Sequence, residues 1–433
     1  MTFLEFQARL DALGLFHMDL TLERMRAFVE RAGLPDFAVL HVVGTNGKGS
    51  TATMLAELLA AHGLRTGLYT SPHLVDVRER VLVDGCRLSE EAWARYGAEA
   101  LRLSGEGADG LGLTYFELLT AVALLAFRGQ GVQAAVMEAG LGGRFDATNV
   151  VNPQMTVFTP IAMDHMNVLG ATLAEIAGDK AGAMRPGGLA VSAAQAPEAR
   201  DVLQARAREL GCELVDGPGV LYYSRANGRL EPGPLGKGFV RPLRDLWLGL
   251  HGTHQEDNAR LALAAFHVWA RRLRLPVSGE ACREALGRAF IPGRMQRVPA
   301  ALCQEHGLPE LILDGGHNPH GLSALAASLK ADEVRPSAVV FGCLGDKPLG
   351  EMLPLVKEMA GGARLIACGI PTCPRALAPQ ALAGLLGTAE HAPDVHAALG
   401  LLAEVPGPVL VCGSLYLLGE FYTKHDWLLE RPA

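Results

Sequence analysis

The chain has 433 residues, of which 49% are hydrophobic and 20% are charged. This length exceeds one ordinary domain of ~100 to 200 residues, so we expect two domains, each able to bury a core. A net charge of −7 argues against nucleic acid or an anionic membrane surface as the main partner.

The amino-terminal segment and the longest apolar run predict neither a targeting signal nor a membrane span. Glu5 stands where a secretory leader would carry basic residues, and the apolar run at 118–127 ends at Arg128. We therefore expect a cytoplasmic protein. Eight cysteines show no C-x-x-C pair or zinc-ligand spacing, and we expect buried thiols.

In the first half, apolar runs of strand length alternate with helical patterns. The sequence predicts a strand at AVLHVV (38–43), a glycine loop, and a helix that stops at Gly63. A strand at RTGLYTS (65–71) and a hairpin turned at Asp84-Gly85 follow. A helix at 114–128 stands before buried strands in 133–140 and 155–161. This alternation is typical of an α/β fold with a mainly parallel sheet.

Thr172 and Glu175 have capping-box spacing and predict a helix that carries Lys180. Residues 216–245 predict irregular chain or short strands, and helices follow at about 255–273 and 278–290. Pro292-Gly293 interrupts any helix, so we place the domain boundary there, giving domains 1–293 and 294–433. Strands at 310–314, 337–344, 363–369 and 408–414 then alternate with helices, as in a second, smaller α/β domain.

The segment HVVGTNGKGSTATM (41–54) combines a strand end, a glycine loop and a helix start. Its glycines permit a tight turn close to a ligand, Lys48 can neutralise phosphate charge, and Ser50 or Thr51 can ligate Mg²⁺. The spacing departs from G-x-x-x-x-G-K-[ST], because Gly49 separates Lys48 from Ser50. A glycine turn without ligand is the alternative, but the whole combination favours nucleotide binding.

Three further predicted strands end in polar residues. TSPHL offers Ser71 and His73, MEAGLGGRFDATN offers Glu138, Arg144 and Asp146, and MDHMNVLG offers Asp164 and His165. Open α/β sheets bind ligands at the carboxyl ends of their strands, and hard oxygen ligands suit Mg²⁺. Taken singly, each histidine is more often structural, and Asp146 is a turn former.

The segments GTNGKGST, TSPHLVDVRERVLVDG, MEAGLGGRFDATN, HQEDNARLALAA, IPGRMQ and LDGGHNPHG, in this order, resemble the dihydrofolate synthase/folylpolyglutamate synthase family of the Mur ligase superfamily. The resemblance covers nearly the whole chain. It implies a P-loop-type central ATPase domain that binds ATP and pterin or folate, and a Rossmann-like carboxyl-terminal domain that binds glutamate. It also implies an acyl phosphate, formed from ATP and a pteroate or folate carboxylate, that the amine of L-glutamate attacks.

The resemblance also implies roles for individual residues. ATP would be held by Thr45, Asn46, Gly47, Lys48, Gly49, Ser50, Asn258, Arg294 and Asp314. Two Mg²⁺ ions would be held by Ser71, Glu138, His165 and Lys180, the last as a carbamate, and K⁺ is a further candidate ion. Catalysis would involve Lys48, Lys180, His165, Glu138, Asp314 and His317. From the residues alone, a solvated Lys180 and a loop-capping His317 are the alternatives.

The implied acid site lies at Asp19, Leu20, Thr114, Tyr115, Phe116, Glu117, Phe145, Asp146 and Ala147, with Ser414 on the glutamate side. Phe116 and Phe145 can cover a flat heteroaromatic ring, although both also suit an ordinary core. In the segment MDLTLERM, Thr21 stands where the family has glycine. Polyglutamylation is therefore the firmer expectation than dihydrofolate synthase activity.

Other classes fit the sequence less well. A cell-wall Mur ligase would carry a UDP-sugar domain before the loop, and only 43 residues precede Gly44. A regulatory GTPase would carry an N-K-x-D motif, which does not occur, and a P-loop kinase would not need the second domain. We expect a monomer whose partners are small molecules, namely ATP, L-glutamate, dihydropteroate and folates.

Overall fold

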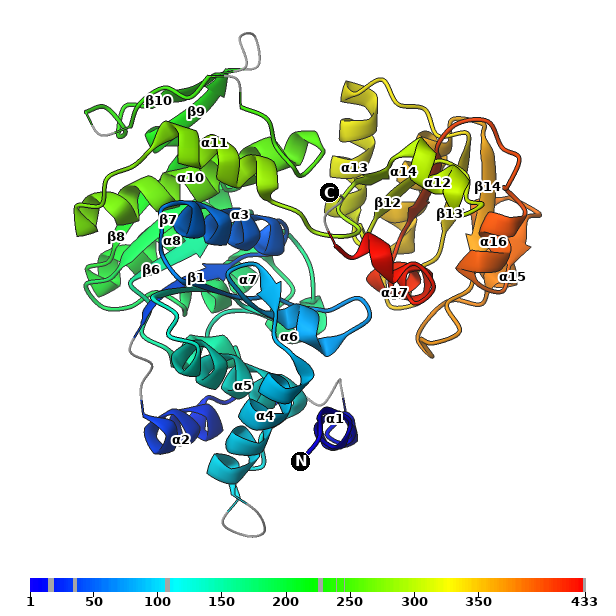
Figure 1. The fold of residues 1–433 in the computed structure, drawn as a ribbon. Helices are drawn as coiled ribbons and strands as arrows, with labels where there is room; N and C mark the ends of the chain where they lie inside the picture. Colours follow the sequence, from blue (N-terminus) through cyan, green and yellow to red (C-terminus); the bar gives the residue numbers. More distant parts are fainter. Residues whose placement is uncertain are drawn as a thin grey trace. The chain divides into compact units, whose positions relative to one another are not determined.

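The computed structural model describes residues 1–14, 19–33, 37–105, 110–224, 229–238, 240–244 and 246–430. Residue 18 of the MDLTLERM segment lies outside them. The chain forms two compact units (Figure 1): unit 1 comprises Met1–Trp247 and Asn258–Arg288, and unit 2 comprises Leu248–Asp257 and Ala289–Ala433. The predicted first domain, 1–293, includes the segment Leu248–Asp257, whereas the contacts group this segment with unit 2.

Unit 1 is built on an eight-stranded sheet with the order β4-β3-β2-β5-β1-β6-β7-β8. All neighbours from β2 to β8 are parallel, and β3 and β4 form the predicted antiparallel hairpin at one edge. The strands are β1 (Ala38–Val43), β2 (Thr66–Tyr69), β3 (Val81–Val83), β4 (Cys86–Arg87), β5 (Ala134–Glu138), β6 (Met155–Phe158), β7 (Leu189–Ser192) and β8 (Glu213–Asp216).

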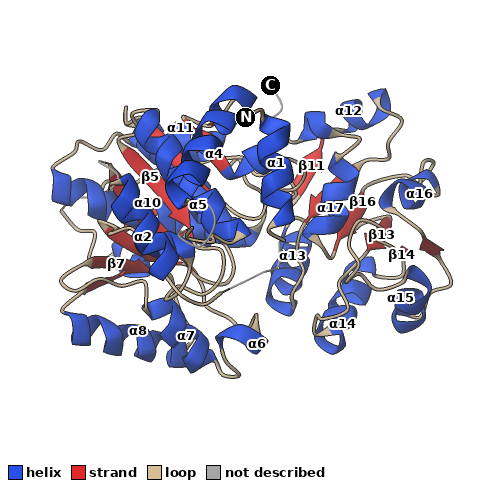
Figure 2. Cartoon of the chain, turned by 90° about the horizontal axis from the view of Figure 1, so that it is seen from below, coloured by secondary structure: helices blue, strands red, loops and turns tan. Residues whose placement is uncertain are grey.

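Helices surround this sheet (Figure 2). They are α1 (Phe3–Ala12), α2 (Glu23–Ala32), α3 (Lys48–Ala61), α4 (Glu90–Ser104), α5 (Tyr115–Gly129), α6 (Met166–Leu169), α7 (Leu173–Ala181), α8 (Pro197–Leu210), α9 (Gly217–Val220), α10 (Thr253–Leu273) and α11 (Gly279–Arg288). Helix α3 packs on β1, β2 and β5, and α11 packs on α3. Helices α1, α2, α4 and α5 share a core with the strands that includes Phe6, Phe28, Trp93 and Phe127.

Local signals explain where several helices begin. Thr172 and Glu175 form the predicted capping box of α7, in which each side chain accepts a hydrogen bond from the other residue's backbone N–H. Thr114 and Glu117 cap α5 in the same way. In the described part of 216–245, the chain forms α9 and the antiparallel strands β9 (Leu221–Ser224) and β10 (Arg229–Pro232), which confirms the expected short elements.

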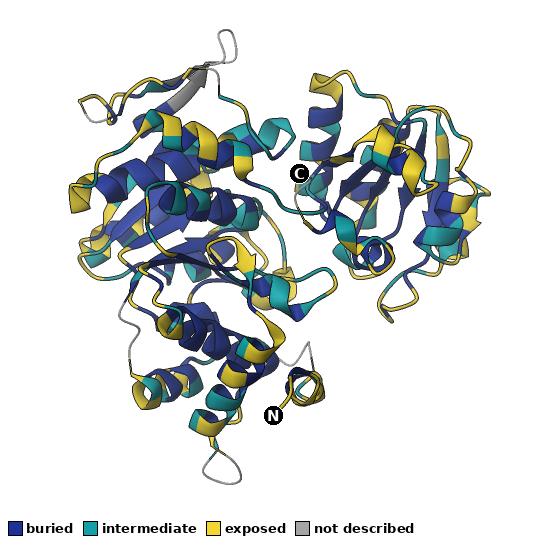
Figure 3. Ribbon diagram, viewed as in Figure 1, coloured by how far each residue is buried: buried dark blue, intermediate teal, exposed yellow. Residues whose placement is uncertain are grey.

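Unit 2 contains a six-stranded sheet with the order β11-β12-β16-β13-β14-β15, parallel except for β11. Its strands are β11 (Gln296–Val298), β12 (Leu311–Asp314), β13 (Ala338–Phe341), β14 (Arg364–Cys368), β15 (His391–Ala392) and β16 (Val409–Cys412). Its helices are α12 (Ala300–Glu305), α13 (Pro319–Ala331), α14 (Leu349–Ala360), α15 (Pro379–Leu386), α16 (Val395–Gly400) and α17 (Leu415–Tyr422). Both α/β units thus have the predicted mainly parallel sheets, and their central strands are buried (Figure 3).

All eight cysteines are free, and seven are buried as predicted. Cys86 is exposed, because it lies in the short edge strand β4. Among the described residues, no helix is long and apolar enough to cross a membrane.

Candidate functional site

Four adjacent parallel strands, β2, β5, β1 and β6, bring their carboxyl ends to one edge of the unit 1 sheet. The glycine loop follows β1, Ser71 follows β2, and Glu138 ends β5. The segment with Asp164 and His165 follows β6. This edge is where open α/β sheets bind ligands, so the predicted strand-end residues reach one region of the fold.

Backbone and side-chain contacts fix the glycine loop. The N–H groups of Thr45 and Asn46 donate to the carbonyl oxygen of Pro160 over 3.0 and 3.4 Å, and the Thr45 hydroxyl bonds the backbone of Ala162. Gly47, with φ of 81°, precedes α3 and gives it no side-chain cap. The first N–H groups of α3 are therefore available to an anion, as nucleotide binding requires.

Asn258, far away in the sequence, lies against this loop. A β-carbon on Gly47 would come within 2.3 Å of the Asn258 Oδ1 atom. Asn258 is buried on α10, and it is the first residue of this helix that belongs to unit 1. The predicted nucleotide residues of unit 1 thus lie together, and both the positive φ and the close amide require glycine at position 47.

Glu138 and Ser71 lie beside the start of α3. Glu138 is buried, and its Oε2 accepts a hydrogen bond of 3.0 Å from the Ser71 N–H. A β-carbon on Gly49 would lie 3.5 Å from the same oxygen. The carboxylate and the Ser71 hydroxyl are hard oxygen donors of the kind that suit Mg²⁺. No group of three or more His, Cys, Asp or Glu side chains suited to a metal occurs in the described ranges, so further ligands would come from phosphate and water.

Lys180 is buried at 3% exposure, which excludes the solvated alternative that its sequence context favours. Its Nζ donates to the carbonyl oxygen of Gly44 over 2.7 Å. Burial, together with the nearby charge of Lys48, lowers the pKa of Lys180 to about 7, although carboxylates including Asp179 and Asp164 oppose this shift. Lys48 donates to the carbonyl oxygen of Thr45 over 3.1 Å. Two amines therefore converge on the loop.

His165 is more exposed than the other predicted metal ligands. It precedes α6 in the left-handed conformation with φ of 51°, and half of its side chain is accessible. Its Nε2 lies 4.0 Å from the Asp164 carboxylate. The ring therefore lies at the surface end of the segment after β6.

The predicted acid-binding residues at the start of α5 form a charged network with α2. Glu117 is buried and accepts two hydrogen bonds of 3.0 Å from the Arg24 guanidinium and one of 2.8 Å from the Thr114 N–H. Arg24 also donates to Asp19. Arg24 was not predicted as a site residue, because no local pattern in the sequence signals a pair 93 positions apart. Leu20, which follows Asp19 in the chain, is exposed.

The aromatic candidates differ in accessibility. Phe116 is partly buried, with its ring centroid 5.9 Å from that of Tyr69, whereas Phe145 is 41% exposed. Tyr115 and Ala147 are buried. The buried carboxylate of Asp146 accepts hydrogen bonds from the N–H groups of Leu141 and Thr148, as the turn-forming interpretation expects, and burial raises its pKa.

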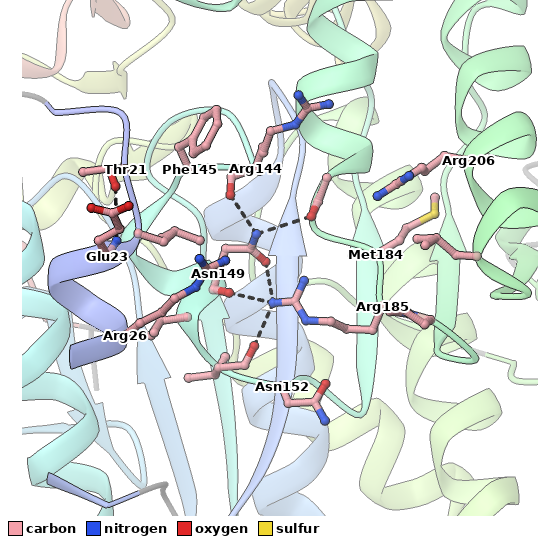
Figure 4. A pocket seen from close by; sticks show the side chains of 16 residues that line it. Thr21, Glu23, Arg26, Arg144, Phe145, Asn149, Asn152, Met184, Arg185 and Arg206 are labelled. Carbon is pink, nitrogen blue, oxygen red and sulfur yellow. Dashed lines mark hydrogen bonds between the residues drawn. The ribbon is translucent and has the colours of Figure 1, made fainter. Parts of the chain in front are cut away.

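A cavity of about 680 Å³ opens beside Phe145 (Figure 4). Phe145 is the predicted site residue that lines it. Thr21 belongs to the MDLTLERM segment, which the sequence also places at the acid site, and Arg144 precedes Phe145 in the chain. The other lining residues are Leu22, Glu23, Arg26, Asn149, Val150, Val151, Asn152, Gly182, Met184, Arg185, Pro186, Arg206 and Leu210.

In unit 2, the predicted residues gather at the carboxyl ends of the neighbouring strands β12 and β16. Asp314 ends β12 and accepts hydrogen bonds of 2.8 Å from the N–H groups of Met295 and Gly316. His317 Nδ1 lies 2.9 Å from the carbonyl oxygen of Gly315, as the loop-capping interpretation expects. Ser414 is buried and caps α17. A β-carbon on Gly315 would lie 3.3 Å from the guanidinium of Arg294, which places Arg294 at this edge.

Comparison with known families defines the class first. Residues 42–215 match the Mur ligase middle domain, and residues 293–415 match the glutamate ligase domain of Mur ligases. The chain is therefore built from the two domains of a Mur-type ligase.

The particular family follows from full-length relatives. The chain is 34% identical over 92% of its length to a dihydrofolate synthase/folylpolyglutamate synthase of Bacillus subtilis, covering 93% of that protein. The protein of the same name from Escherichia coli is also 34% identical, over 93% of this chain and 90% of its own. The chain belongs to the dihydrofolate synthase/folylpolyglutamate synthase family.

Solved structures agree in fold. Folylpolyglutamate synthase of Mycobacterium tuberculosis complexed with ADP matches with a TM-score of 0.84 and 30% identity, over 100% of this chain and 99% of that chain. E. coli FolC in complex with DHPP and ADP matches with a TM-score of 0.84 and 31% identity, over 99% of this chain and 98% of that chain.

Proposed function

We propose that this protein is an ATP-dependent ligase that joins L-glutamate to dihydropteroate and to the γ-carboxylate of folates through an acyl phosphate. The observation that carries the proposal is the convergence of Lys48, Lys180 and Glu138 on an uncapped helix start at one sheet edge. The relatives that share the chain's full length are named for both activities, and homologous structures contain ADP.

The chemistry follows from the groups at the loop. The N–H groups of α3 and the Lys48 ammonium would bind the phosphates and stabilise negative charge on the phosphoryl group as it moves to the acid. The glutamate amine then attacks the acyl carbon, and phosphate leaves from the tetrahedral intermediate. Glu138 and Ser71, with His165, would hold Mg²⁺, which when bound supplies charge neutralisation at the phosphates.

Lys180 is proposed to carry a carbamate. A neutral amine attacks CO₂ to form a C–N bond and releases a proton, and a pKa near 7 makes the neutral amine available near neutral pH. The product replaces a buried cation with two anionic oxygens beside the loop, where they would serve a second Mg²⁺. K⁺ is a further candidate ion at this site.

The acid is assigned to the region around Phe116, Phe145 and the start of α5. The exposed ring of Phe145 supports stacking on a flat heteroaromatic face. The Arg24 network supports a fixed position for the Asp19 segment. On the glutamate side, Ser414 and His317 remain candidates from unit 2. A monomeric state remains a prediction, which light scattering on the purified chain would measure.

A phosphate-release assay tests the function. Purified protein with Mg²⁺ and ATP should release phosphate only when both L-glutamate and a pteroate or folate acid are present. Parallel reactions with dihydropteroate and tetrahydrofolate separate the bifunctional enzyme from one that only lengthens folates. Release with a UDP-muramyl peptide in place of the folate acid would contradict the proposal.

A further inference from the structure

Residues 159–162, the loop wall, leave β6 and run beside the glycine loop. The carbonyl oxygen of Pro160 accepts hydrogen bonds from the N–H groups of Thr45 and Asn46 over 3.0 and 3.4 Å. The backbone N–H and carbonyl groups of Ala162 both bond the Thr45 hydroxyl, each over 3.1 Å. The course of the loop wall therefore sets where the first residues of the glycine loop lie.

The loop wall and the glycine loop are in close contact. A β-carbon on Gly44 would come within 1.9 Å of the Thr159 Oγ1 atom and 2.9 Å of the Thr159 carbonyl oxygen. The Thr159 N–H also donates to the carbonyl oxygen of Val43 over 2.8 Å. Because protein interiors are closely packed, a shift of the loop wall would move the glycine loop as well.

Gln195, which follows the neighbouring strand β7, holds the loop wall. Its Nε2 donates to the carbonyl oxygen of Thr159 over 3.0 Å, and its Oε1 accepts from the Ile161 N–H over 2.9 Å. The Ile161 N–H and the Pro160 carbonyl belong to one planar peptide group, in which they point in opposite directions. This peptide group is thus bonded to Gln195 on one side and to the glycine loop on the other, and each hydrogen bond polarises the next.

The partners of Gln195 also fix the orientation of its amide. One backbone partner is an acceptor and the other is a donor, so a single orientation satisfies both. The Ser192 hydroxyl accepts from the same Nε2 over 3.2 Å and donates to the carbonyl oxygen of Ala193 over 2.9 Å. A carboxylate or an apolar side chain at position 195 could not make this set of bonds.

We propose that Gln195 is a positioning residue for nucleotide binding, acting on the glycine loop through the peptide group between Pro160 and Ile161. The inference rests on the proposed function, because it takes the loop to bind ATP. An anion at the start of α3 needs N–H groups that already point toward it. A loop held in place before binding spares the cost of ordering it when the nucleotide arrives.

Calorimetric titration of the full chain with ADP and Mg²⁺ tests this role. Gln195→Leu can make neither backbone bond, and it should bind ADP about tenfold more weakly than the parent. Gln195→Glu keeps the shape and the acceptor for Ile161 but turns a second acceptor toward the Thr159 carbonyl, so it should lose about as much affinity. Gln204→Leu, which changes an exposed glutamine of α8, is the matched control and should bind ADP like the parent.

Steady-state kinetics separate positioning from general damage. In both Gln195 variants, the KM for ATP should rise about tenfold while the KM for the folate acid stays at the parent value, because the predicted acid residues do not depend on the loop wall. The melting temperature should stay within roughly a few degrees of the parent's. Equal rises of both KM values would make Gln195 a structural residue and overturn the inference.

Parent-like ADP affinity in either Gln195 variant would overturn the positioning role and leave the ligase proposal untouched. If Gln195→Leu fails to fold, Gln195→Glu decides the question, since it preserves the side-chain shape. Calorimetry needs no turnover, so weakened ADP binding in the variants of a chain without ligase activity would support Gln195 and reject only the proposed function. A parent chain that does not bind ADP would contradict both.

Discussion

The substitution Gly49→Ala should remove the activity of the glycine loop without lowering the stability of the fold. Gly49 is the second residue of α3, and the β-carbon of Gly49→Ala would lie 3.5 and 3.7 Å from the two Glu138 carboxylate oxygens. These are ordinary van der Waals distances, so no clash is created. Alanine in place of helical glycine should stabilise the fold by up to about 1 kcal/mol.

The same methyl group should abolish most of the activity. A magnesium ion binds a carboxylate oxygen at ~2.1 Å, so an ion between Glu138 and the loop would come closer to the methyl than van der Waals contact permits. We expect kcat/KM for phosphate release to fall about 100-fold, which corresponds to ~2.7 kcal/mol.

The matched control is Gly350→Ala. Gly350 is also the second residue of a helix, α14 in unit 2, and a β-carbon there would meet open space. Both variants should melt within roughly a few degrees of the parent, but only Gly49→Ala should lose activity. A fully active Gly49→Ala protein would refute the idea that Glu138 and the loop act on one ligand. A Gly49→Ala protein that fails to fold would refute the steric reasoning.

Three other changes should have distinct effects. Lys48→Ala should abolish turnover while leaving the melting temperature nearly unchanged, because the side chain contributes charge and little packing; loss of folding would make Lys48 structural. Arg24→Ala should lower the free energy of unfolding by about 3 kcal/mol in denaturant titration, since it leaves the buried Glu117 carboxylate without its guanidinium, and an unchanged midpoint would contradict this. With ¹³C-bicarbonate, NMR should detect a carbamate above pH 7 that disappears below it, where Lys180 is protonated, and that is missing in Lys180→Gln; a pH-independent signal would contradict the assignment.

Local sequence signals predicted much of the fold. Thr172 and Glu175 are close enough in the chain to cap α7 without help from other elements, and Asp84-Gly85 supplies the positive φ angles that its hairpin turn needs. The strand ends at Glu138 and Ser71 also followed from the sequence, because parallel strands bring their carboxyl ends to one edge.

Contacts between distant segments were not predictable. The pairing of Arg24 with Glu117 depends on how α2 packs beside α5, and the cavity beside Phe145 joins separate stretches of chain. The burial of Lys180 was equally hidden, since a lysine near a helix end is usually solvated. Each of these features depends on tertiary packing, which no periodicity in the sequence records.

A crystal structure of the chain grown with AMPPCP and Mg²⁺ tests the central claim most directly. We predict triphosphate oxygens on the backbone of Thr45 to Ser50 and on Lys48, with Mg²⁺ bound to Glu138 and Ser71. A nucleotide bound elsewhere, or a metal ion that does not contact Glu138, would contradict the account.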